Sequence, residues 1–152
     1  MNENLNSGKD VIISIVGTQT FPDNDKDVIE LVTDGKYLHN NGETYFSYME
    51  SELTGLAGTR TTFSVKPDSV TMSRVGSLNT TMIFEPGKKH YFLYDTPYGA
   101  AAMGVSTRSV KHSLGEHGGD MEIEYLIDIE HTTIGKNNFK INVRESGRQE
   151  SV

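Results

Sequence analysis

Arg74 is the residue whose type and position in this sequence most favour chemistry. It follows Val70 and Met72 at intervals of two, and Thr71 and Ser73 take the alternate positions. Residues two apart in a β-strand share one face, so we expect Arg74 to lie with the two apolar residues on an inner face. An unpaired buried charge is costly, so the guanidinium needs a partner.

Three kinds of partner fit a buried guanidinium: a carboxylate of the protein, a ring of backbone carbonyls, or an anionic ligand. In a functional interpretation Arg74 binds the carboxylate or phosphate of a ligand in bidentate fashion. In a structural interpretation it stacks on aromatic rings and seals one end of the interior. The sequence leaves both open.

Other polar residues also stand at alternating positions that are expected to face inward. Tyr94 alternates with His90 and Phe92, Thr107 alternates with Val105, and Tyr125 lies within an apolar strand face. A few converging polar groups in an apolar cavity are typical of a small-molecule site. The alternative is a set of core residues that satisfy one another's hydrogen bonds. The candidate ligand-binding residues are Arg74, His90, Tyr94, Thr96, Tyr98, Thr107 and Tyr125.

Catalytic and metal-binding signatures are missing from the sequence. The five histidines do not stand at a metal-binding spacing, and His-Glu-x-x-His, the nucleophile elbow and the P-loop do not occur. Glu50 and Glu52 would lie about 7 Å apart on one strand face. Such a pair suits two-carboxylate chemistry, but an outward acidic face is the commoner arrangement. We therefore expect no catalytic residues, no metal and no cofactor.

Period-two alternation dominates the chain and predicts the elements that position these residues. Its clearest case is 121–129, where Met121, Ile123 and Tyr125 share one face and Glu122 and Glu124 lie on the other. The predicted strands are 11–21, 27–37, 44–53, 60–66, 70–75, 80–85, 89–94, 105–114, 121–129 and 139–143.

Turn chemistry separates the predicted strands. Turns are expected at 40–42, 66–69, 85–88, 115–120 and 135–138, where Gly, Asn, Asp and Pro gather. The turns at 66–69, 85–88 and 115–120 should each pair the two strands beside them. The stretch 96–104 is small and apolar, and we expect a loop or a single helical turn over a barrel mouth.

These elements predict an all-β fold: a closed antiparallel meander barrel of about eight to ten strands, because closure removes two bare edges. A two-sheet sandwich is the second possibility. One domain is expected over residues 9–145, with flexible ends at 1–8 and 146–152.

Composition limits the partners. The 152 residues include no cysteine, which fits a reducing cytoplasm. The net charge of −7 disfavours nucleic acid, and neither a signal peptide nor a membrane-spanning run is present. A cytoplasmic protein without membrane or nucleic-acid partners is expected, and the sequence does not indicate its oligomeric state.

Several short runs resemble the YwiB-like family of uncharacterised bacterial proteins. They are Met72-Ser73-Arg74-Val75-Gly76, the run 82–90, Tyr94-Asp95-Thr96-Pro97-Tyr98-Gly99, Thr107, Gly118-Gly119 and Glu124-Tyr125. The resemblance spans about 11–144. It implies a barrel with a central cavity, similar in fold to the calycins, which include lipocalins and fatty-acid-binding proteins. It implies no function.

We expect non-catalytic binding of a small, partly apolar ligand in this cavity, with an anionic ligand as one option, and the mouth of the cavity would lie near 96–103. An interaction module that uses the acidic and aromatic outer surface, with Tyr91 or Tyr98, is the alternative. An enzyme of unknown reaction comes third, since fold does not exclude chemistry.

Overall fold

Ten antiparallel strands and one short 3₁₀ helix are formed by the residues that the computed structural model describes, 8–96 and 99–146. Of the expected flexible ends, 1–8 and 146–152, only residues 8 and 146 lie within this range. The elements are β1 (Lys9–Thr20), β2 (Lys26–Asn40), β3 (Glu43–Met49), η2 (Glu52–Thr54), β4 (Arg60–Lys66), β5 (Ser69–Val75), β6 (Thr80–Phe84), β7 (Lys89–Thr96), β8 (Gly99–His112), β9 (Gly118–Ile129) and β10 (Thr132–Glu145).

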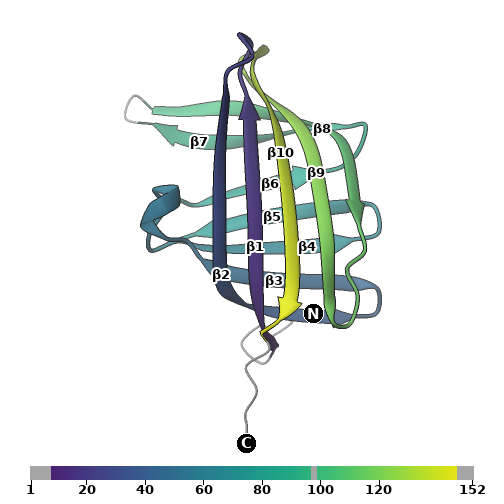
Figure 1. The fold of residues 1–152 in the computed structure, drawn as a ribbon. Helices are drawn as coiled ribbons and strands as arrows, with labels where there is room; N and C mark the ends of the chain where they lie inside the picture. The colour runs from purple at the N-terminus through teal and green to yellow at the C-terminus, as the bar shows by residue number, and fades with distance from the viewer. Residues whose placement is uncertain (1–7, 97–98, 147–152) are drawn as a thin grey trace, which may run out of the picture.

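The strands form one sheet that curls into a nearly closed barrel, in the order β6-β5-β4-β3-β2-β1-β10-β9-β8-β7. In Figure 1, β1, β2, β9 and β10 run vertically in front, and β3 to β7 cross behind them. The first and last strands are joined in register from Val11 opposite Glu145 to Thr20 opposite Lys136. The expected all-β barrel is therefore confirmed.

The barrel has a seam between β6 and β7. The turn at 85–88 was expected to pair these two strands, but that prediction is wrong: among the described residues β6 pairs only with β5, and β7 only with β8. Just before β7 the backbone bonds to β8 instead, because Gly87 N–H donates to Thr107 O and Thr107 N–H donates to Lys88 O. A side-chain contact, His90 Nε2 to Glu85 Oε1 at 2.9 Å, crosses the seam.

Alternating side chains fill the interior, as the sequence predicts. On β9, Met121, Ile123 and Tyr125 are buried, and Leu126 is 41% exposed. Aromatic rings stack inside the barrel, with Phe46 and Phe63 centroids 5.0 Å apart. The hydrophobic effect over this continuous core is the main source of stability.

Two local predictions are wrong. The alanine-rich stretch from Gly99 is neither a loop nor a helical turn but the first part of β8, where Ala102 pairs with Leu93 of β7. The expected turn at 135–138 lies inside β10, and Gly135 marks a register shift there. The actual turn uses Glu130 and His131, whose φ angles are 50° and 70°, the left-handed backbone that a two-residue hairpin needs.

The strand expected over 44–53 ends early. Glu50 follows β3 and is buried, and Glu52 begins η2. These acids therefore do not share an outward strand face. Ser51 caps η2 by accepting a hydrogen bond from Leu53 N–H, and Gly55 ends it with φ of 78°. Glu50 keeps the inward parity of Phe46 and Tyr48, and η2 begins two residues later.

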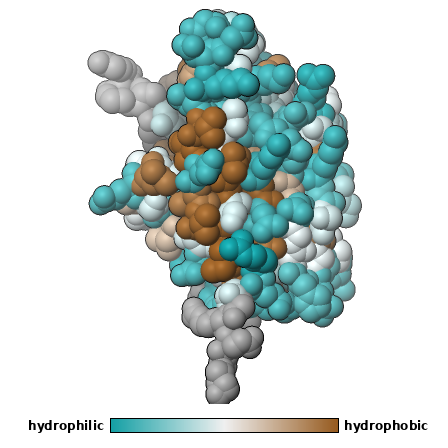
Figure 2. All heavy atoms as spheres, viewed as in Figure 1, coloured by the Kyte–Doolittle hydropathy of each residue, from teal (hydrophilic) through white to brown (hydrophobic). Residues whose placement is uncertain are grey.

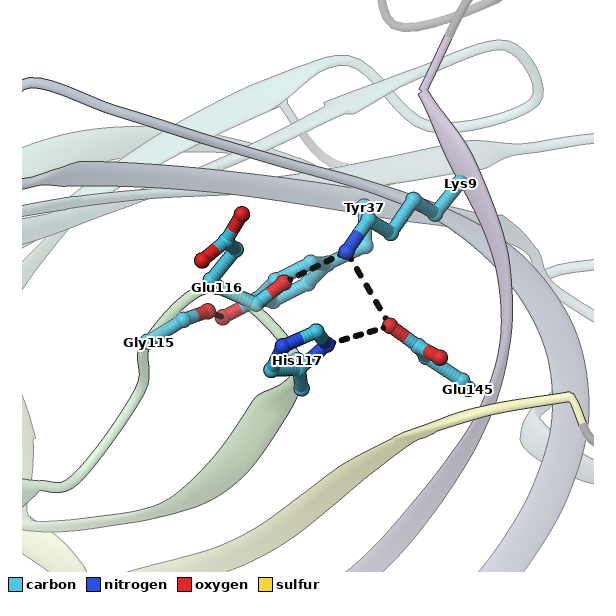
Figure 3. A network of polar contacts seen from close by, with 6 residues as sticks. All are labelled: Lys9, Tyr37, Gly115, Glu116, His117 and Glu145. Carbon is cyan, nitrogen blue, oxygen red and sulfur yellow. Dashed lines mark hydrogen bonds and ion pairs between the residues drawn. The ribbon is translucent and has the colours of Figure 1, made fainter.

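Polar contacts pin the end of the barrel where β1 begins and β10 ends (Figure 3). Lys9 Nζ donates to the carbonyl of Glu116 at 2.9 Å and lies 3.0 Å from Glu145 Oε2. Nδ1 of His117 lies 2.8 Å from the same carboxylate oxygen. The loop between β8 and β9 is thus tied to both end strands.

A buried tyrosine holds the same loop from inside the barrel. The hydroxyl of Tyr37 on β2 donates to the carbonyl of Gly115 at 2.6 Å (Figure 3). Burial of the side chain raises the pKa of Tyr37, so the hydroxyl stays a donor at neutral pH.

Candidate functional site

A cavity of about 300 Å³ lies between the front and back strands on the side of η2. Its front wall comes from β1, β2, β9 and β10, and its back wall from β3, β4, β5 and the η2 segment. The volume is at the lower limit for ligand pockets, so only a small molecule fits. Its apolar lining residues are Ile15, Ile29, Leu31, Leu56, Phe63 and Phe139, and its main polar ones are Tyr48, Glu50, Thr54, Arg74, Tyr125 and Asn137.

The Glu50 carboxylate is the centre of the polar side of the cavity. Its side chain is only 1% exposed. Thr61 donates to Oε2 at 2.5 Å and Thr54 donates to Oε1 at 2.9 Å. Both oxygens are therefore satisfied by hydroxyls, which is the condition for burying a carboxylate at tolerable cost.

Arg74 lies beside this carboxylate on β5, on the inner face with Val70 and Met72 as its parity predicts. Nε lies 3.8 Å from Glu50 Oε2 and donates to the Thr61 hydroxyl at 3.4 Å. Of the partners left open by the sequence, a protein carboxylate is present. Nε is the only guanidinium nitrogen of Arg74 that donates a hydrogen bond to the described residues. A guanidinium carries five N–H donors, so four remain for another partner.

Two tyrosines face the same guanidinium. Burial raises the pKa of Tyr48, the nearby charge of Glu50 adds to the rise, and the charge of Arg74 opposes it. Burial also raises the pKa of Tyr125, again opposed by Arg74. Both phenols are therefore neutral hydrogen-bonding groups at physiological pH.

Tyr125 also belongs to an aromatic wall. Its ring lies 4.8 Å from that of Phe84 and 5.7 Å from that of Phe139, both in tilted geometry. Phe139 lines the cavity with Tyr125. The site thus combines a polar side from the back strands with an apolar and aromatic front.

The structure brings together only two of the predicted site residues, Arg74 and Tyr125, in this cavity. His90 lies at the barrel seam, where its hydrogen bond lowers the pKa of the Glu85 carboxyl. Tyr94 shares the inward parity of Phe92 but is 39% exposed near the end of β7. Thr96 ends β7.

Tyr98 lies outside the described residues. Thr107 is buried next to Tyr125, its cross-strand neighbour, but lines a hollow on the outside of β8 and β9 rather than the cavity. Its hydroxyl has no hydrogen-bond partner among the described residues. These positions do not join the cluster around Arg74.

Sequence reasoning missed Glu50, Tyr48 and Thr61. A signal for the first two was present, since positions 44, 46, 48 and 50 alternate and Phe46 marks the inner face. Continued alternation places Glu50 inside, but an acidic residue was assigned to the outside on composition. Thr61 shares its inward parity with Phe63.

Other features give weaker sites. A second hollow outside β1, β9 and β10 is lined by outward side chains such as Ser14, Glu122 and Lys140. Across the described ranges, no three histidine, aspartate or glutamate side chains are arranged to hold a metal ion. In the same ranges, no helix has the length and apolar character required to cross a membrane.

Comparisons with known proteins agree with this fold. Residues 13–141 match the model of the domain of unknown function DUF1934. The chain is 28% identical over 103 residues to the uncharacterised β-barrel protein YwiB of Bacillus subtilis (strain 168), an alignment that covers 68% of this chain and 71% of YwiB. The crystal structure of the ywiB protein from Bacillus subtilis superposes with a TM-score of 0.79 at 22% identity, and covers 91% of this chain and 92% of that one. This second likeness supports the barrel fold alone.

Proposed function

Because this chain belongs to the DUF1934 family, a family defined without an activity, we propose its function from the cavity: non-catalytic binding of a small, partly apolar molecule with an anionic group. The proposal keeps the cytoplasmic location and the likeness to calycin barrels expected from the sequence. The observation that carries it is Arg74, a guanidinium in a lined cavity that uses only Nε within the described protein.

The chemistry of the walls supports a ligand with two different ends. A carboxylate or phosphate accepts hydrogen bonds from the terminal guanidinium nitrogens of Arg74, and the neutral phenol of Tyr125 adds a donor. Ile29 and Leu31 of β2 offer apolar surface to the rest of the molecule. Ile29 is 46% exposed, so a ligand there removes apolar surface from water.

The proposal favours binding over catalysis. Glu50 is the acid closest to Arg74, but its oxygens accept from Thr61 and Thr54, which leaves it poorly placed to move a proton to or from a ligand. Its negative charge also offsets that of Arg74. A ligand anion must therefore lie on the side of the guanidinium away from Glu50.

Native mass spectrometry of protein purified from its own host, followed by crystallography, tests the proposal. We expect a small molecule inside the barrel with its anionic group on Arg74. Calorimetry with octanoate and octanamide as probes adds a controlled comparison: octanoate should bind at least about tenfold more tightly. A dry, fully packed interior would end the proposal.

Two variants separate the cavity from the surface. Arg74→Met should lose the preference for octanoate over octanamide. Arg108→Met removes an exposed arginine outside the cavity and should keep that preference. If both variants show the same preference for octanoate over octanamide, Arg74 does not bind the anionic group.

A further inference from the structure

A long stretch of β2 has a free edge. Residues 26–35 pair with β1 on one side, from Lys26 opposite Thr20 to Gly35 opposite Val11. Pairing with β3 on the other side begins only at Lys36, and no other described strand takes its place. Every second residue of this stretch therefore presents its backbone N–H and C=O to the outside.

Apolar side chains flank this free edge. Val28 is 55% exposed and Val32 66% exposed, and both lie on the outward face with Thr18 and Ser14 of β1 opposite them. Figure 2 shows apolar side chains gathered over the part of the front layer where β1 and β2 lie. Exposed apolar surface beside an unpaired edge favours the addition of another strand.

The charge of the stretch selects the kind of strand. Asp27, Glu30 and Asp34 are exposed acids along it, and Lys26 at its start is the one base between 26 and 35. Opposite charges directly across two strands stabilise the pair and like charges destabilise it. An incoming segment with basic side chains therefore matches this edge.

We propose that residues 26–35 of β2 bind an extended basic segment of a partner protein as an additional strand of the barrel sheet. Backbone hydrogen bonds to the free edge supply the affinity, and Glu30 and Asp34, which share the outward face with Val28 and Val32, select lysine or arginine at the partner positions opposite them. The inward side chains of this stretch, Asp27, Ile29 and Leu31, line the cavity, but the proposal uses the backbone edge and the outward face and does not depend on a ligand in the cavity.

A second copy of this chain is a poor occupant of the same edge. Antiparallel pairing of two copies centred on Glu30 sets the two glutamates against each other, and sets Asp34 of each copy opposite Lys26 of the other. Shifting the register by one residue sets Asp27 of each copy against Asp34 of the other. Because residues 26–35 carry three acids and one base, two copies of the stretch bear the same net charge, which disfavours self-association.

Three labelled synthetic peptides of about ten residues test the proposal by fluorescence anisotropy. In the first, lysine alternates with valine and threonine. The second carries glutamate in place of lysine, and the third keeps the lysines but has proline at alternate positions, which cannot pair with a strand. We expect the first to bind at least about tenfold more tightly than either of the others, and less tightly at high salt.

Two charge-reversed variants locate the binding. Glu30→Lys with Asp34→Lys alters only exposed side chains of the free edge, and should weaken binding of the basic peptide at least about tenfold. Asp68→Lys with Glu116→Lys makes the same change of net charge on exposed acids elsewhere and should leave binding within about twofold.

Three results would overturn the proposal. Equal binding of the basic and the proline-containing peptides would indicate charge attraction without strand pairing. Equal losses in the two variants would place the site elsewhere. A dimer of the unmodified protein in sedimentation experiments, abolished by the edge variant, would make a second copy the occupant.

Discussion

Nε of Arg74 lies 3.8 Å from Oε2 of Glu50, and the hydroxyl of Thr61 stands between them, accepting from the arginine at 3.4 Å and donating to the carboxylate at 2.5 Å. The pair is thus joined through a threonine as well as by charge. Removing one member leaves the other buried without its counter-charge, whereas removing both does not.

Arg74→Met should lower the free energy of unfolding by about 1–3 kcal/mol, since the Glu50 carboxylate then keeps only its hydroxyl donors. Adding Glu50→Gln to this variant should recover part of the loss. Urea unfolding of both single variants and the double variant measures the coupling. Strictly additive effects would contradict the interaction.

The buried tyrosines should resist ionisation. Burial raises the pKa of Tyr37, Tyr48 and Tyr125, so the folded state disfavours their phenolates. The stability linked to these groups is fully present below the ordinary tyrosine pKa, and it is lost as the pH rises toward the raised values.

Ultraviolet titration of the tyrosines checks this. Three of the seven tyrosines should ionise only together with unfolding, as followed by circular dichroism. Tyr48→Phe should reduce the late step. A single titration step for the unmodified protein would count against the burial described here.

Parity along single strands was predictable from the sequence, and pairing between strands was much less so. Alternation along β5 correctly places the side chains of Val70, Met72 and Arg74 on the inner face of the barrel. The direction of a side chain is a local property of extended backbone. The ladder between β1 and β10 joins the two ends of the sequence. Nothing in either strand alone encodes that neighbour.

The turn expected at 135–138 was predicted wrongly because strand pairing outweighs the local turn preference of its residues. Asn137 and Asn138 favour a turn in isolation, yet they lie in β10 opposite Tyr125 and Glu124. The adjacent hairpin instead places Glu130 and His131 at positive φ, where residues other than glycine are uncommon. The register of a long ladder outweighs a preference of about 1 kcal/mol at single residues.

Because Glu145 contacts His117 and Lys9, the free energy of unfolding should decrease at acid pH. The hydrogen bond from His117, and after it that from Lys9, lowers the pKa of the Glu145 carboxyl. A lowered pKa contributes stability above the ordinary carboxyl value, and the contribution is lost as the pH falls through the lowered value.

Urea midpoints measured from neutral pH down to acid pH test this effect. Glu145→Gln should flatten the acid limb of the curve, and Asp68→Asn, which removes an exposed acid outside this contact, is the control. The change should be small, because these side chains are solvated. Identical acid limbs for Glu145→Gln and the unmodified protein would contradict the prediction.

Gly35 should tolerate no side chain. A Cβ there would lie 2.5 Å from the backbone oxygen of Ser47 and 2.4 Å from Cδ1 of Ile13, where β2 begins to pair with β3 as well as β1. Gly35→Ala should lower the free energy of unfolding by about 1–3 kcal/mol or more.

Gly115→Ala is the matched control for that substitution, because a Cβ at Gly115 meets nothing within 4 Å and its φ is not positive. It should change stability by less than about 0.5 kcal/mol. Thermal or urea unfolding of both variants decides the matter, and equal stabilities would contradict the close approach of β2 to β3.

The order of strands around the barrel has a consequence for how the chain can be cut. Each strand bonds to its sequence neighbours except at β6 and β7, and β1 bonds to β10, with Ser146 N–H donating to Asp10 O at 3.2 Å. A circular permutant opened between Pro86 and Gly87, with a short linker from residue 146 to residue 8, retains every one of the nine strand ladders. In the permutant the chain runs from β7 to β6 and each strand pairs with the next one along the chain. The two new termini lie at the seam.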